Sequence, residues 1–461
     1  MADRIKYAIG QKIAAVFQKF KTPVEEPCRS EDYTDRCQWD IIHQIEEMTL
    51  IEILRLALAK RHEAYRELPM KVVSTAQGSC HLVFMVKVRN PVSHKIEGWV
   101  VKIPGHGTPD RWTADDEYML TQEFETMRLI TTYTDVPAAL VVDHCATLDN
   151  EFGFPYLVMK QLPGKSACDL CYDEHCKMPT PETEQKRLNC LRSLARHMTE
   201  LDKLRFDQIG MPMFDPQAED FEILMISKNS ACQLASPFAS TQDYANNAIH
   251  NYDGVSNHQS LPADEIGPLT AEKADEFGTS KFFDIVLSHP VFHSSPTDTF
   301  ALRHSDLDLQ NILIDEEGNV TGIIDWDGSL AMPRCVGHAS VLAFLDRDFY
   351  PEPLVNSPFL CWRAGYYREI YAAALTEAGN VDVEFTTKSH IYQAVFAALY
   401  EDGDMEDLMA RLVKEIDVQI DVWDLKFLLT KGCKATEEML KKELWKVLKP
   451  QMPAEGLLDS I

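Results

Sequence analysis

The stretch that decides the fold comprises residues 302–328 and reads LRHSDLDLQNILIDEEGNVTGIIDWDG. Two short apolar segments, residues 311–314 and 321–324, flank an acidic turn that contains Gly318 and Asn319. Short runs rich in isoleucine on either side of such a turn are typical of a β-hairpin. We therefore predict a hairpin whose turn is centred on Gly318.

The open end of this hairpin brings polar side chains together. Opposed residues of an antiparallel pair have numbers with a constant sum, which a turn centred on Gly318 sets at about 636. Asn311 should then face Asp325 to within one residue, and Asp306 lies on the incoming loop. A carboxylate and a carboxamide oxygen suit Mg²⁺, and a second carboxylate can accept the proton of an attacking hydroxyl. The alternative is that these residues only cap and turn a structural hairpin.

This cluster resembles a known family. The chain is similar to the catalytic and metal-binding loops of the aminoglycoside phosphotransferase family, which has the protein-kinase-like bilobal fold. The resemblance is carried by His304, Ser305, Asp306 and Asn311, followed by Ile324, Asp325, Trp326 and Asp327. With Pro333 and Arg334 included, the segment is most similar to fungal members, whose substrates are mostly unassigned. The resemblance is clear over residues 300–340 and extends more weakly over residues 71–210.

The resemblance implies a role for each matched side chain. Asp306 would be the catalytic base, Asn311 and Asp325 would bind magnesium, and His304 would brace the loop without reacting. Asp308 stands where many bacterial members carry histidine, so the resemblance assigns it no role. Asp327 would either assist the metal or cap a turn.

A β-rich segment precedes this region and would form the nucleotide-binding lobe. We predict strands over residues 72–75, 81–88, 98–103 and 156–159, with a hairpin turn at residues 90–94 and a helix over 113–131. Lys102 ends an apolar strand, where a lysine is costly unless it is paired. In a kinase-like fold this lysine holds the α- and β-phosphates and is oriented by a helix glutamate. Otherwise Lys102 would extend to water at the strand end.

Glu123 is the preferred partner of Lys102. It borders the apolar stripe of Leu120, Phe124 and Met127, so it can face the sheet. Glu125 lies further round the helix and is the second choice. The alternative is that Glu123 belongs to a solvated helix face.

Two further segments would contact the nucleotide. Residues 75–80 lie between two strands, as a phosphate-covering loop should, but they contain one glycine and no G-x-G-x-x-G motif. The backbone N–H groups of Gly78 and Ser79 are candidate phosphate donors, and an ordinary β-turn is the alternative. Residues 154–164 resemble the hinge between the lobes, where adenine would bond to the main chain near Lys160 and Gln161.

Composition limits the function further. The 461 residues include 45 Lys plus Arg against 72 Asp plus Glu, which gives a net charge of −27. Such an acidic chain is unsuited to general nucleic-acid binding and would suit a cationic partner, although solubility alone also explains the charge. The sequence contains no apolar run long enough for a membrane span and no secretory signal pattern. The 12 cysteines are scattered, which favours a reduced, cytoplasmic setting.

The first 22 residues differ from the rest of the chain. They carry five Lys or Arg against one Asp, and their apolar residues recur at helical spacing. This pattern fits a packed N-terminal helix. A mitochondrial presequence is the alternative, although the segment is poor in Arg and Ser.

Two other patterns carry less weight. Cys168, Cys171 and Cys176 with His175 offer zinc-type ligands, but no second Cys-x-x-Cys pair lies nearby, and we disfavour zinc there. The acidic run at residues 401–407 is a candidate cation site, although we favour a solvated loop that starts a helix, where acidic residues are stabilised at the N-terminus.

We therefore predict an α+β, kinase-like chain with three parts. These are an N-terminal helical extension over residues 1–70, a nucleotide lobe over 71–163 and a helical lobe over 164–461. Further helices are expected over residues 39–48, 50–68, 184–203, 242–249, 271–288, 367–378, 390–400 and 436–448, with a largely irregular segment over 227–260.

The expected activity is Mg²⁺-dependent transfer of the γ-phosphoryl group of ATP to a hydroxyl of a small molecule. One alternative is a nucleotide-binding scaffold without turnover, which the glycine-poor loop favours. A protein kinase is disfavoured because Asp325 is followed by Trp instead of Phe-Gly and no Ala-Pro-Glu occurs. The sequence defines neither the acceptor nor the oligomeric state.

Overall fold

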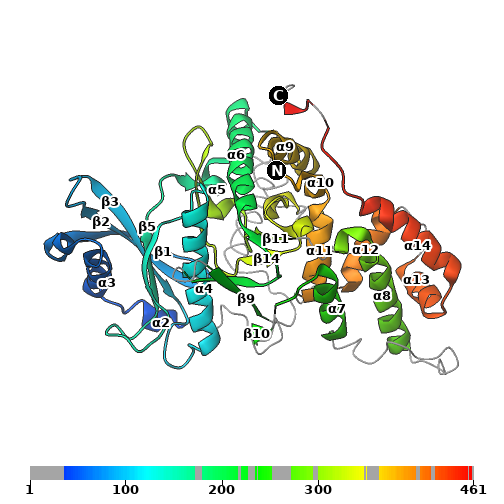
Figure 1. The fold of residues 1–461 in the computed structure, drawn as a ribbon, viewed down its shortest axis with the longest axis horizontal. Helices are drawn as coiled ribbons and strands as arrows, with labels where there is room; N and C mark the ends of the chain where they lie inside the picture. The colour runs from blue at the N-terminus through cyan, green and yellow to red at the C-terminus, as the bar shows by residue number, and fades with distance from the viewer. Residues whose placement is uncertain are drawn as a thin grey trace, which may run out of the picture. The chain divides into compact units, whose positions relative to one another are not determined.

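The structure is a computed structural model, shown in Figure 1. It describes residues 36–171, 179–215, 220–226, 234–235, 237–251, 271–293, 299–346, 349, 363–400, 405–416, 421–454 and 456–458. Residues 37–461 form one compact unit. The predicted helix within residues 1–22 lies outside the described residues. Among the helices described, none combines the length and apolar character needed to cross a membrane.

A five-stranded antiparallel sheet forms the first part of this unit. Its strands run in the order β1-β2-β3-β5-β4, and their bounds are β1 (Met70–Gln77), β2 (His81–Arg89), β3 (Ile96–Pro104), β4 (Val141–Cys145) and β5 (Tyr156–Lys160). The four predicted strands are confirmed, and each is longer than predicted. Strand β4 was not predicted, because Asp143 and His144 interrupt its apolar pattern.

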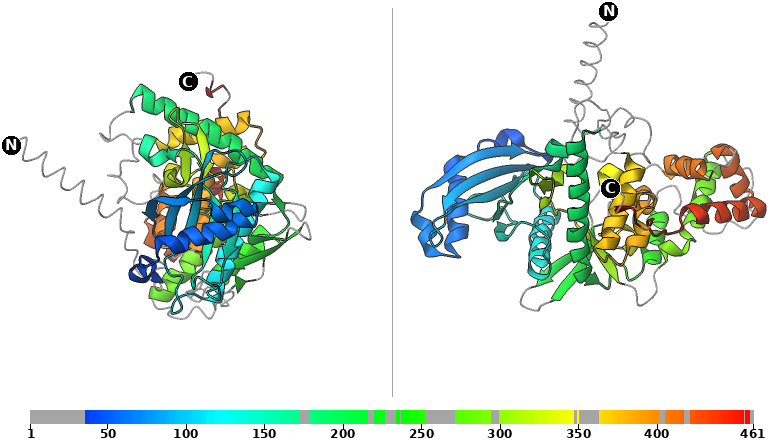
Figure 2. Two further views of the ribbon diagram at one scale, coloured as in Figure 1. Left: turned by 90° about the vertical axis from the view of Figure 1, so that its left-hand side faces the viewer. Right: turned by 90° about the horizontal axis from the view of Figure 1, so that it is seen from above.

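The two faces of the sheet pack against different helices. Trp99, Val101 and Ile103 alternate along β3 and share one buried cluster with the helices α2 (Trp39–Ile42) and α3 (Glu47–Ala59). Figure 2 shows α3 lying across the strands on that side. Val100 lies between these residues on β3 and faces the other side of the sheet, where it packs against a second cluster that includes α4 (Ala114–Tyr133). Because side chains alternate along a strand, Lys102 lies on the α4 face.

Helix α4 starts at a well-defined cap. The Thr113 side chain accepts a hydrogen bond from the Asp116 amide, and the Asp116 carboxylate accepts one from the Thr113 amide. This capping box fixes the first turn. It confirms the predicted start at residue 113, and the helix runs two residues beyond the predicted end.

The remaining chain is mainly helical. The longer helices are α6 (Pro181–Glu200), α7 (Thr241–Asn251), α8 (Ala271–Leu287), α9 (Ala364–Glu377), α11 (Ser389–Tyr400), α12 (Met405–Glu415), α13 (Val422–Thr430) and α14 (Lys434–Val447), and shorter ones are α5 (Ala167–Cys171) and α10 (Val383–Thr386). Every predicted helical segment contains a helix, although residues 39–48 and 50–68 are divided into shorter pieces. Helix α12 begins within the acidic run at residues 401–407, where a helix start was expected, and helix α13 was not predicted.

Three small antiparallel sheets lie among these helices. One joins β7 (Arg205–Phe206), β11 (Phe300–Arg303) and β14 (Leu330–Met332), and another joins β8 (Met211–Asp215), β9 (Asp220–Ile226) and β10 (Leu234–Ala235). The third joins β6 (Lys165–Ser166), β12 (Ile312–Ile314) and β13 (Val320–Ile323). Strand β10 and helix α7 lie within residues 227–260, so the described part of that segment contains regular structure.

The β12–β13 pair is the hairpin predicted from the sequence. Ile312 pairs with Ile323, and the Ile324 amide donates to the carbonyl oxygen of Asn311 at 3.0 Å. Asn311 thus lies opposite Ile324, which is within the one-residue tolerance of the prediction. The turn contains Gly318 at φ +90°, a backbone conformation that favours glycine.

Candidate active site

Lys102 is held between two carboxylates. Its Nζ atom lies 2.8 Å from Glu123 Oε1 and 2.9 Å from Asp325 Oδ1, and the lysine is 5% exposed. Burial alone would lower the pKa of Lys102, but the charges of Glu123 and Asp325 raise it above its usual value. The amine therefore stays charged in a buried position, which is what an anionic ligand such as a phosphate requires.

The helix supplies the glutamate that the apolar stripe indicated. Glu123 is 2% exposed and faces the sheet. Burial raises its pKa, and the charge of Lys102 opposes this rise. Glu125, the second choice, forms an ion pair with Arg128 at 3.0 Å on the same helix. The preference for Glu123 over Glu125 as the partner of Lys102 is therefore confirmed.

The loop before β12 positions Asp306. The Asn311 side-chain amide donates to Asp306 Oδ2 at 3.0 Å and to the Asp306 carbonyl oxygen at 2.8 Å. Asp306 itself is exposed, while Asn311 is buried. Partial desolvation, with the charges of Asp308 and Asp325, raises the pKa of Asp306. A carboxylate with a raised pKa that is open to an incoming group has the properties of a general base.

His304 links this loop to the end of the hairpin. Its Nδ1 atom accepts from the Asp306 amide at 3.1 Å, and its Nε2 atom lies 2.9 Å from the Ile324 carbonyl oxygen. Since Nδ1 is an acceptor, the proton of the neutral ring is on Nε2. Burial lowers the pKa of His304 to about 4. The ring is therefore neutral and holds two backbone segments together, as the bracing role requires.

Asp325 occupies an unusual backbone position at the hairpin exit. Its φ is +66°, a left-handed conformation that is uncommon outside glycine. The next residue anchors this turn, because the buried Trp326 indole donates to the Ile323 carbonyl oxygen at 3.0 Å. The Asp325 side chain remains 43% exposed, and the charge of Lys102 lowers its pKa to about 2. Asp325 therefore presents an ionised carboxylate that is open on one side.

Two neighbouring aspartates have structural contacts. Asp308 is buried, and its side chain accepts from the Leu309 amide, so it caps the short helical turn before β12. The carbonyl oxygen of Asp327 accepts a hydrogen bond from the Ser305 hydroxyl, and burial raises the pKa of the Asp327 carboxyl. The sequence left Asp308 without a role, and the structure shows that it caps this turn.

The predicted phosphate-covering loop is shorter than expected. Strand β1 continues to Gln77, so that Gly78, Ser79 and Cys80 alone connect it to β2. The Gly78 amide already donates to the His81 carbonyl oxygen at 2.9 Å. The Gly78 amide is therefore engaged within the turn, while phosphate binding by Gly78 and Ser79 stays a prediction.

The predicted hinge is also partly occupied by backbone hydrogen bonds. The Lys160 amide donates to Leu140 O at 2.8 Å, and the Gln161 amide donates to Gly98 O at 3.0 Å. The Lys160 side chain forms an ion pair with Glu97. Adenine contact at residues 160 and 161 would therefore use carbonyl oxygens, since both amides are engaged in the sheet.

The donor set fits a magnesium–nucleotide pair. The Asn311 amide nitrogen is turned toward Asp306, so its carboxamide oxygen is directed away from that residue. Asp325 contributes an exposed, ionised carboxylate. Two oxygen ligands of this kind, with the remaining positions left to water and phosphate oxygens, are typical of Mg²⁺ sites in phosphoryl-transfer proteins.

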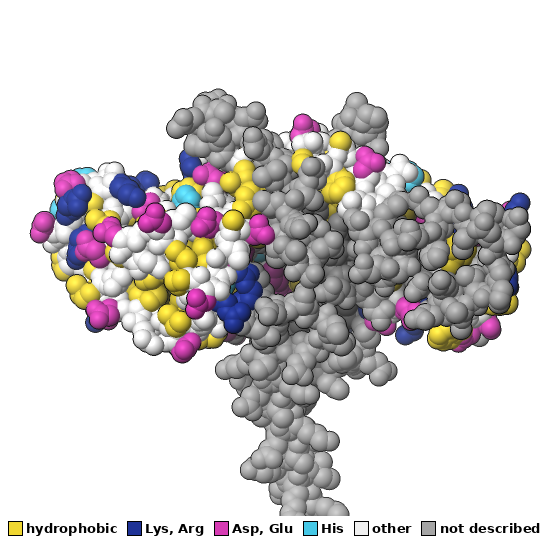
Figure 3. Space-filling model, turned by 90° about the horizontal axis from the view of Figure 1, so that it is seen from below, with side chains coloured by type: hydrophobic (Ala, Val, Ile, Leu, Met, Phe, Trp, Pro, Cys, Tyr) yellow, Lys and Arg dark blue, Asp and Glu magenta, His cyan; other side chains and the backbone are white. Residues whose placement is uncertain are grey.

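The Cys/His pattern and the acidic run at residues 401–407 are only partly described by the structure. His175 and Cys176 of the disfavoured zinc pattern lie outside the described residues, as do residues 401–404 of the acidic run. The remaining acidic residues of that run start helix α12 and form ion pairs, Glu406 with Lys426 and Asp407 with Arg411. On the described face in Figure 3, acidic side chains are interspersed with Lys and Arg.

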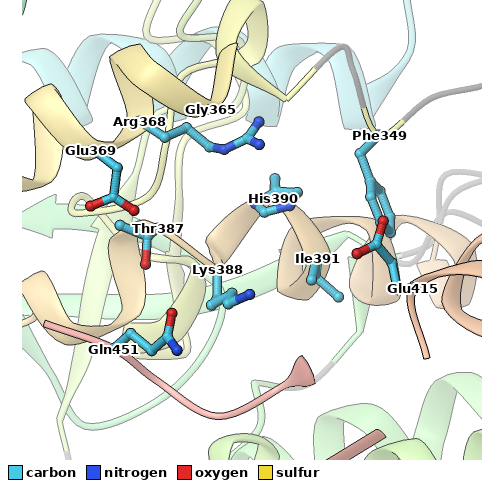
Figure 4. A pocket seen from close by; sticks show the side chains of 10 residues that line it. All are labelled: Phe349, Gly365, Arg368, Glu369, Thr387, Lys388, His390, Ile391, Glu415 and Gln451. Atoms are coloured by element: carbon cyan, nitrogen blue, oxygen red, sulfur yellow. The ribbon is translucent and has the colours of Figure 1, made fainter. Parts of the chain in front are cut away.

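A separate cavity lies in the helical region. It has a volume of about 240 Å³ and is lined by charged side chains of both signs, among them Arg368, Glu369, Lys388 and Glu415 (Figure 4). Its lining includes none of the residues predicted for catalysis or nucleotide binding. We therefore do not include this cavity in the candidate active site.

The family assignment follows from the sequence match. Residues 88–357 match the phosphotransferase enzyme family, and this range is more than half of the 461 residues. The chain therefore belongs to this family. The resemblance found in the catalytic segment is thus confirmed, and so is the α+β, protein-kinase-like fold that it implied.

One curated relative is similar over a short range. The clavilactone A biosynthesis cluster protein Y of Ampulloclitocybe clavipes is 31% identical over 109 residues, which span 23% of this chain and 26% of the relative. The match thus covers about a quarter of the relative's length.

Solved structures with similar folds are distant in sequence. The aminoglycoside phosphotransferase APH(4)-Ia is 12% identical with a TM-score of 0.40, covering 86% of this chain and 99% of that one. Macrolide 2′-phosphotransferase type I is 13% identical with a TM-score of 0.38, covering 78% and 94%. A phosphotransferase from Alicyclobacillus acidocaldarius is 10% identical with a TM-score of 0.30, covering 81% and 92%.

Proposed function

We propose that this chain transfers the γ-phosphoryl group of ATP to a hydroxyl group of a small molecule and requires Mg²⁺. The observation that carries the proposal is the position of Lys102 between Glu123 and Asp325. In this arrangement the ammonium group of Lys102 on the sheet contacts both helix α4, through Glu123, and the end of the hairpin, through Asp325. A phosphotransferase of kinase-like fold needs these three elements at its nucleotide phosphates.

The acceptor hydroxyl would lose its proton to Asp306. This carboxylate is exposed and oriented by the side chain of Asn311, and its raised pKa favours proton uptake. Lys102 would orient the phosphates, with Glu123 fixing the direction of the amine. When bound, Mg²⁺ would be held by Asn311 and Asp325 and would neutralise phosphate charge. Positioning and charge neutralisation supply most of the catalysis in such reactions.

The proposal is tested by assaying the purified full chain with labelled ATP and a metabolite extract, with and without Mg²⁺. We expect a labelled small-molecule product that requires both Mg²⁺ and Asp306. ATP binding by the wild type with neither product formation nor hydrolysis under any condition would contradict the proposal.

That contrary result would favour a nucleotide-binding scaffold without turnover. One observation supports this second candidate, because the Gly78 amide is already used within the β1–β2 turn. Kinase-like enzymes rely on glycine-rich backbone amides at this place to cover the phosphates. The extract assay separates the two candidates, since a scaffold binds ATP but yields no labelled product.

A further inference from the structure

Three potential metal ligands converge away from the candidate active site. Asp202 lies in the short turn after α6, His338 follows β14, and Asp382 immediately precedes α10. One ligand atom from each lies within 4.8 Å of the others. The three residues are far apart in sequence, so the fold itself creates this cluster.

Two of these side chains are buried without hydrogen-bond partners for some of their polar atoms. His338 is 2% exposed, and neither ring nitrogen has a hydrogen-bond partner among the residues that the structure describes. Asp382 is 3% exposed, and within the described part of the chain its Oδ2 atom also has no hydrogen-bond partner. Because buried polar groups are normally satisfied, an imidazole and a carboxylate oxygen left in this state beside one another indicate a missing ligand.

Arg334 fixes the positions of the two carboxylates. Its Nη2 atom lies 2.7 Å from Asp202 Oδ1, and its Nε atom lies 2.7 Å from Asp382 Oδ1. One guanidinium therefore serves two carboxylates, and the second oxygen of Asp202 lies 3.4 Å from Nη2 of Arg205. The second oxygen of Asp382 is still available to a cation. Hydrogen bonds to ligating carboxylates of this kind are common around metal sites.

We propose that Asp202, His338 and Asp382 bind one divalent transition-metal ion, of which Zn²⁺ is the representative. An imidazole with two carboxylates is a donor set for Zn²⁺ and its first-row neighbours, whereas Mg²⁺ prefers oxygen alone. Bonds of about 2.1 Å would draw the ligand atoms to within roughly 4.2 Å of one another, a modest contraction of the cluster. The Asp202 side chain is 19% exposed, so an ion can enter from that side.

The proposed role is structural, because the ion would join three segments of the helical region. These are the end of α6, the chain after β14 and the loop between α9 and α10. The proposal is independent of phosphoryl transfer, and its test needs no nucleotide. The test compares the chelator-treated full-length protein with His338→Leu and with the control His144→Leu, which removes a half-buried imidazole on β4.

Zn²⁺ binding is measured by calorimetry and by the thermal unfolding midpoint with and without chelator. We expect the wild type and His144→Leu to bind one more equivalent than His338→Leu, and their unfolding midpoints to rise with Zn²⁺. Equal stoichiometry in the wild type and His338→Leu, or no Zn²⁺ binding by the wild type, overturns the proposal. If His338 has no ligand, replacing it with leucine removes an unsatisfied buried group and should leave the protein equally or more stable.

A second measurement uses the wild type alone and distinguishes metal bound at this site from metal bound by cysteine thiolates. Co²⁺ bound to nitrogen and oxygen ligands shows weak visible bands, whereas thiolate ligands add an intense charge-transfer band in the near ultraviolet. We expect the first equivalent of Co²⁺ to give the visible bands without the thiolate band. A spectrum dominated by the thiolate band from the first equivalent onward would overturn the assignment even if no variant folds.

Discussion

Lys102 donates a hydrogen bond to Asp325 across 223 positions of the chain, with 2.9 Å between Nζ and Oδ1. Lys102 belongs to β3 of the five-stranded sheet, and Asp325 follows β13 of the β12–β13 hairpin. The same amine binds Glu123 of α4. One buried cation therefore fixes the relative positions of three elements, so its removal should affect both folding and nucleotide binding.

Lys102→Met is expected to destabilise the protein by about 3–5 kcal/mol, because it leaves the Glu123 carboxylate buried without its cation. Burial already raises the pKa of Glu123, and loss of Lys102 raises it further. A carboxyl group with a raised folded-state pKa contributes fully to stability only below its unfolded-state pKa, and this contribution is lost as the pH rises through the folded-state pKa. Urea unfolding at pH 5 and pH 8 should therefore show the larger deficit at pH 8.

Two comparison variants make this prediction specific. Lys102→Met combined with Glu123→Met removes both charges and should regain much of the lost stability while remaining inactive. Lys165→Met removes an exposed lysine paired with Glu316 at 2.9 Å and should cost less than about 1 kcal/mol. An equal loss in Lys102→Met and Lys165→Met would show that the buried pair does not determine stability.

Asp306→Ala should reduce phosphoryl transfer by roughly 10²–10⁴-fold, because the acceptor hydroxyl loses its base. ATP binding should change little, since Asp306 contacts neither Lys102 nor Glu123 through a hydrogen bond. Single-turnover rates and ATP dissociation constants, measured separately, test both parts. Glu317→Gln, which alters a solvent-exposed carboxylate in the hairpin turn, should retain wild-type turnover. Full turnover in Asp306→Ala would rule out its assignment as the base.

Local patterns explain why much of the candidate site was predictable. The hairpin register follows from the turn position alone, and it placed Asn311 within one residue of its observed partner. The apolar stripe on α4 distinguished Glu123 from Glu125, because only one of them can face the sheet. Both inferences depend on strict side-chain periodicity within one element.

Contacts between distant segments were not predictable in this way. Asp325 and Lys102 interact through the way the sheet packs on the hairpin, which no local periodicity encodes. The short strand β11 is held by pairing with β7 on one side and β14 on the other, and the sequences of β7 and β11 are too short to indicate strands. The cluster around His338 likewise combines three separate segments.

The stability of the protein should depend on pH through His304. Its folded-state pKa of about 4 lies below the ordinary value of 6.5. A group with a lowered pKa stabilises the protein fully above its unfolded-state pKa, and this contribution decreases as the pH falls from about 6.5 toward 4. The expected loss is about 3 kcal/mol by pH 4.

The matched variant His304→Asn keeps a side-chain donor and acceptor but does not titrate in this range. Urea unfolding between pH 7.5 and 4.5 should therefore show a shallower pH dependence for His304→Asn than for the wild type. His338 is present in both proteins, so its titration cancels in the comparison. Parallel pH profiles would show that His304 is not the group responsible.

Gly164 should tolerate no side chain, because its backbone is left-handed and its surroundings leave no space for a Cβ atom. Its φ is +105°, and a Cβ atom would lie 2.9 Å from the Ile314 carbonyl oxygen while also meeting Thr321. It directly precedes β6, which pairs with β12 next to the loop that carries Asp306. Gly379 has a positive φ of +79°, but no atom of the described residues lies within 4 Å of a Cβ position there. Gly379→Ala should therefore cost about 1 kcal/mol from backbone conformation alone, and Gly164→Ala roughly 2–4 kcal/mol. Urea unfolding of both variants measures the difference, and equal losses would mean that close packing at Gly164 contributes nothing.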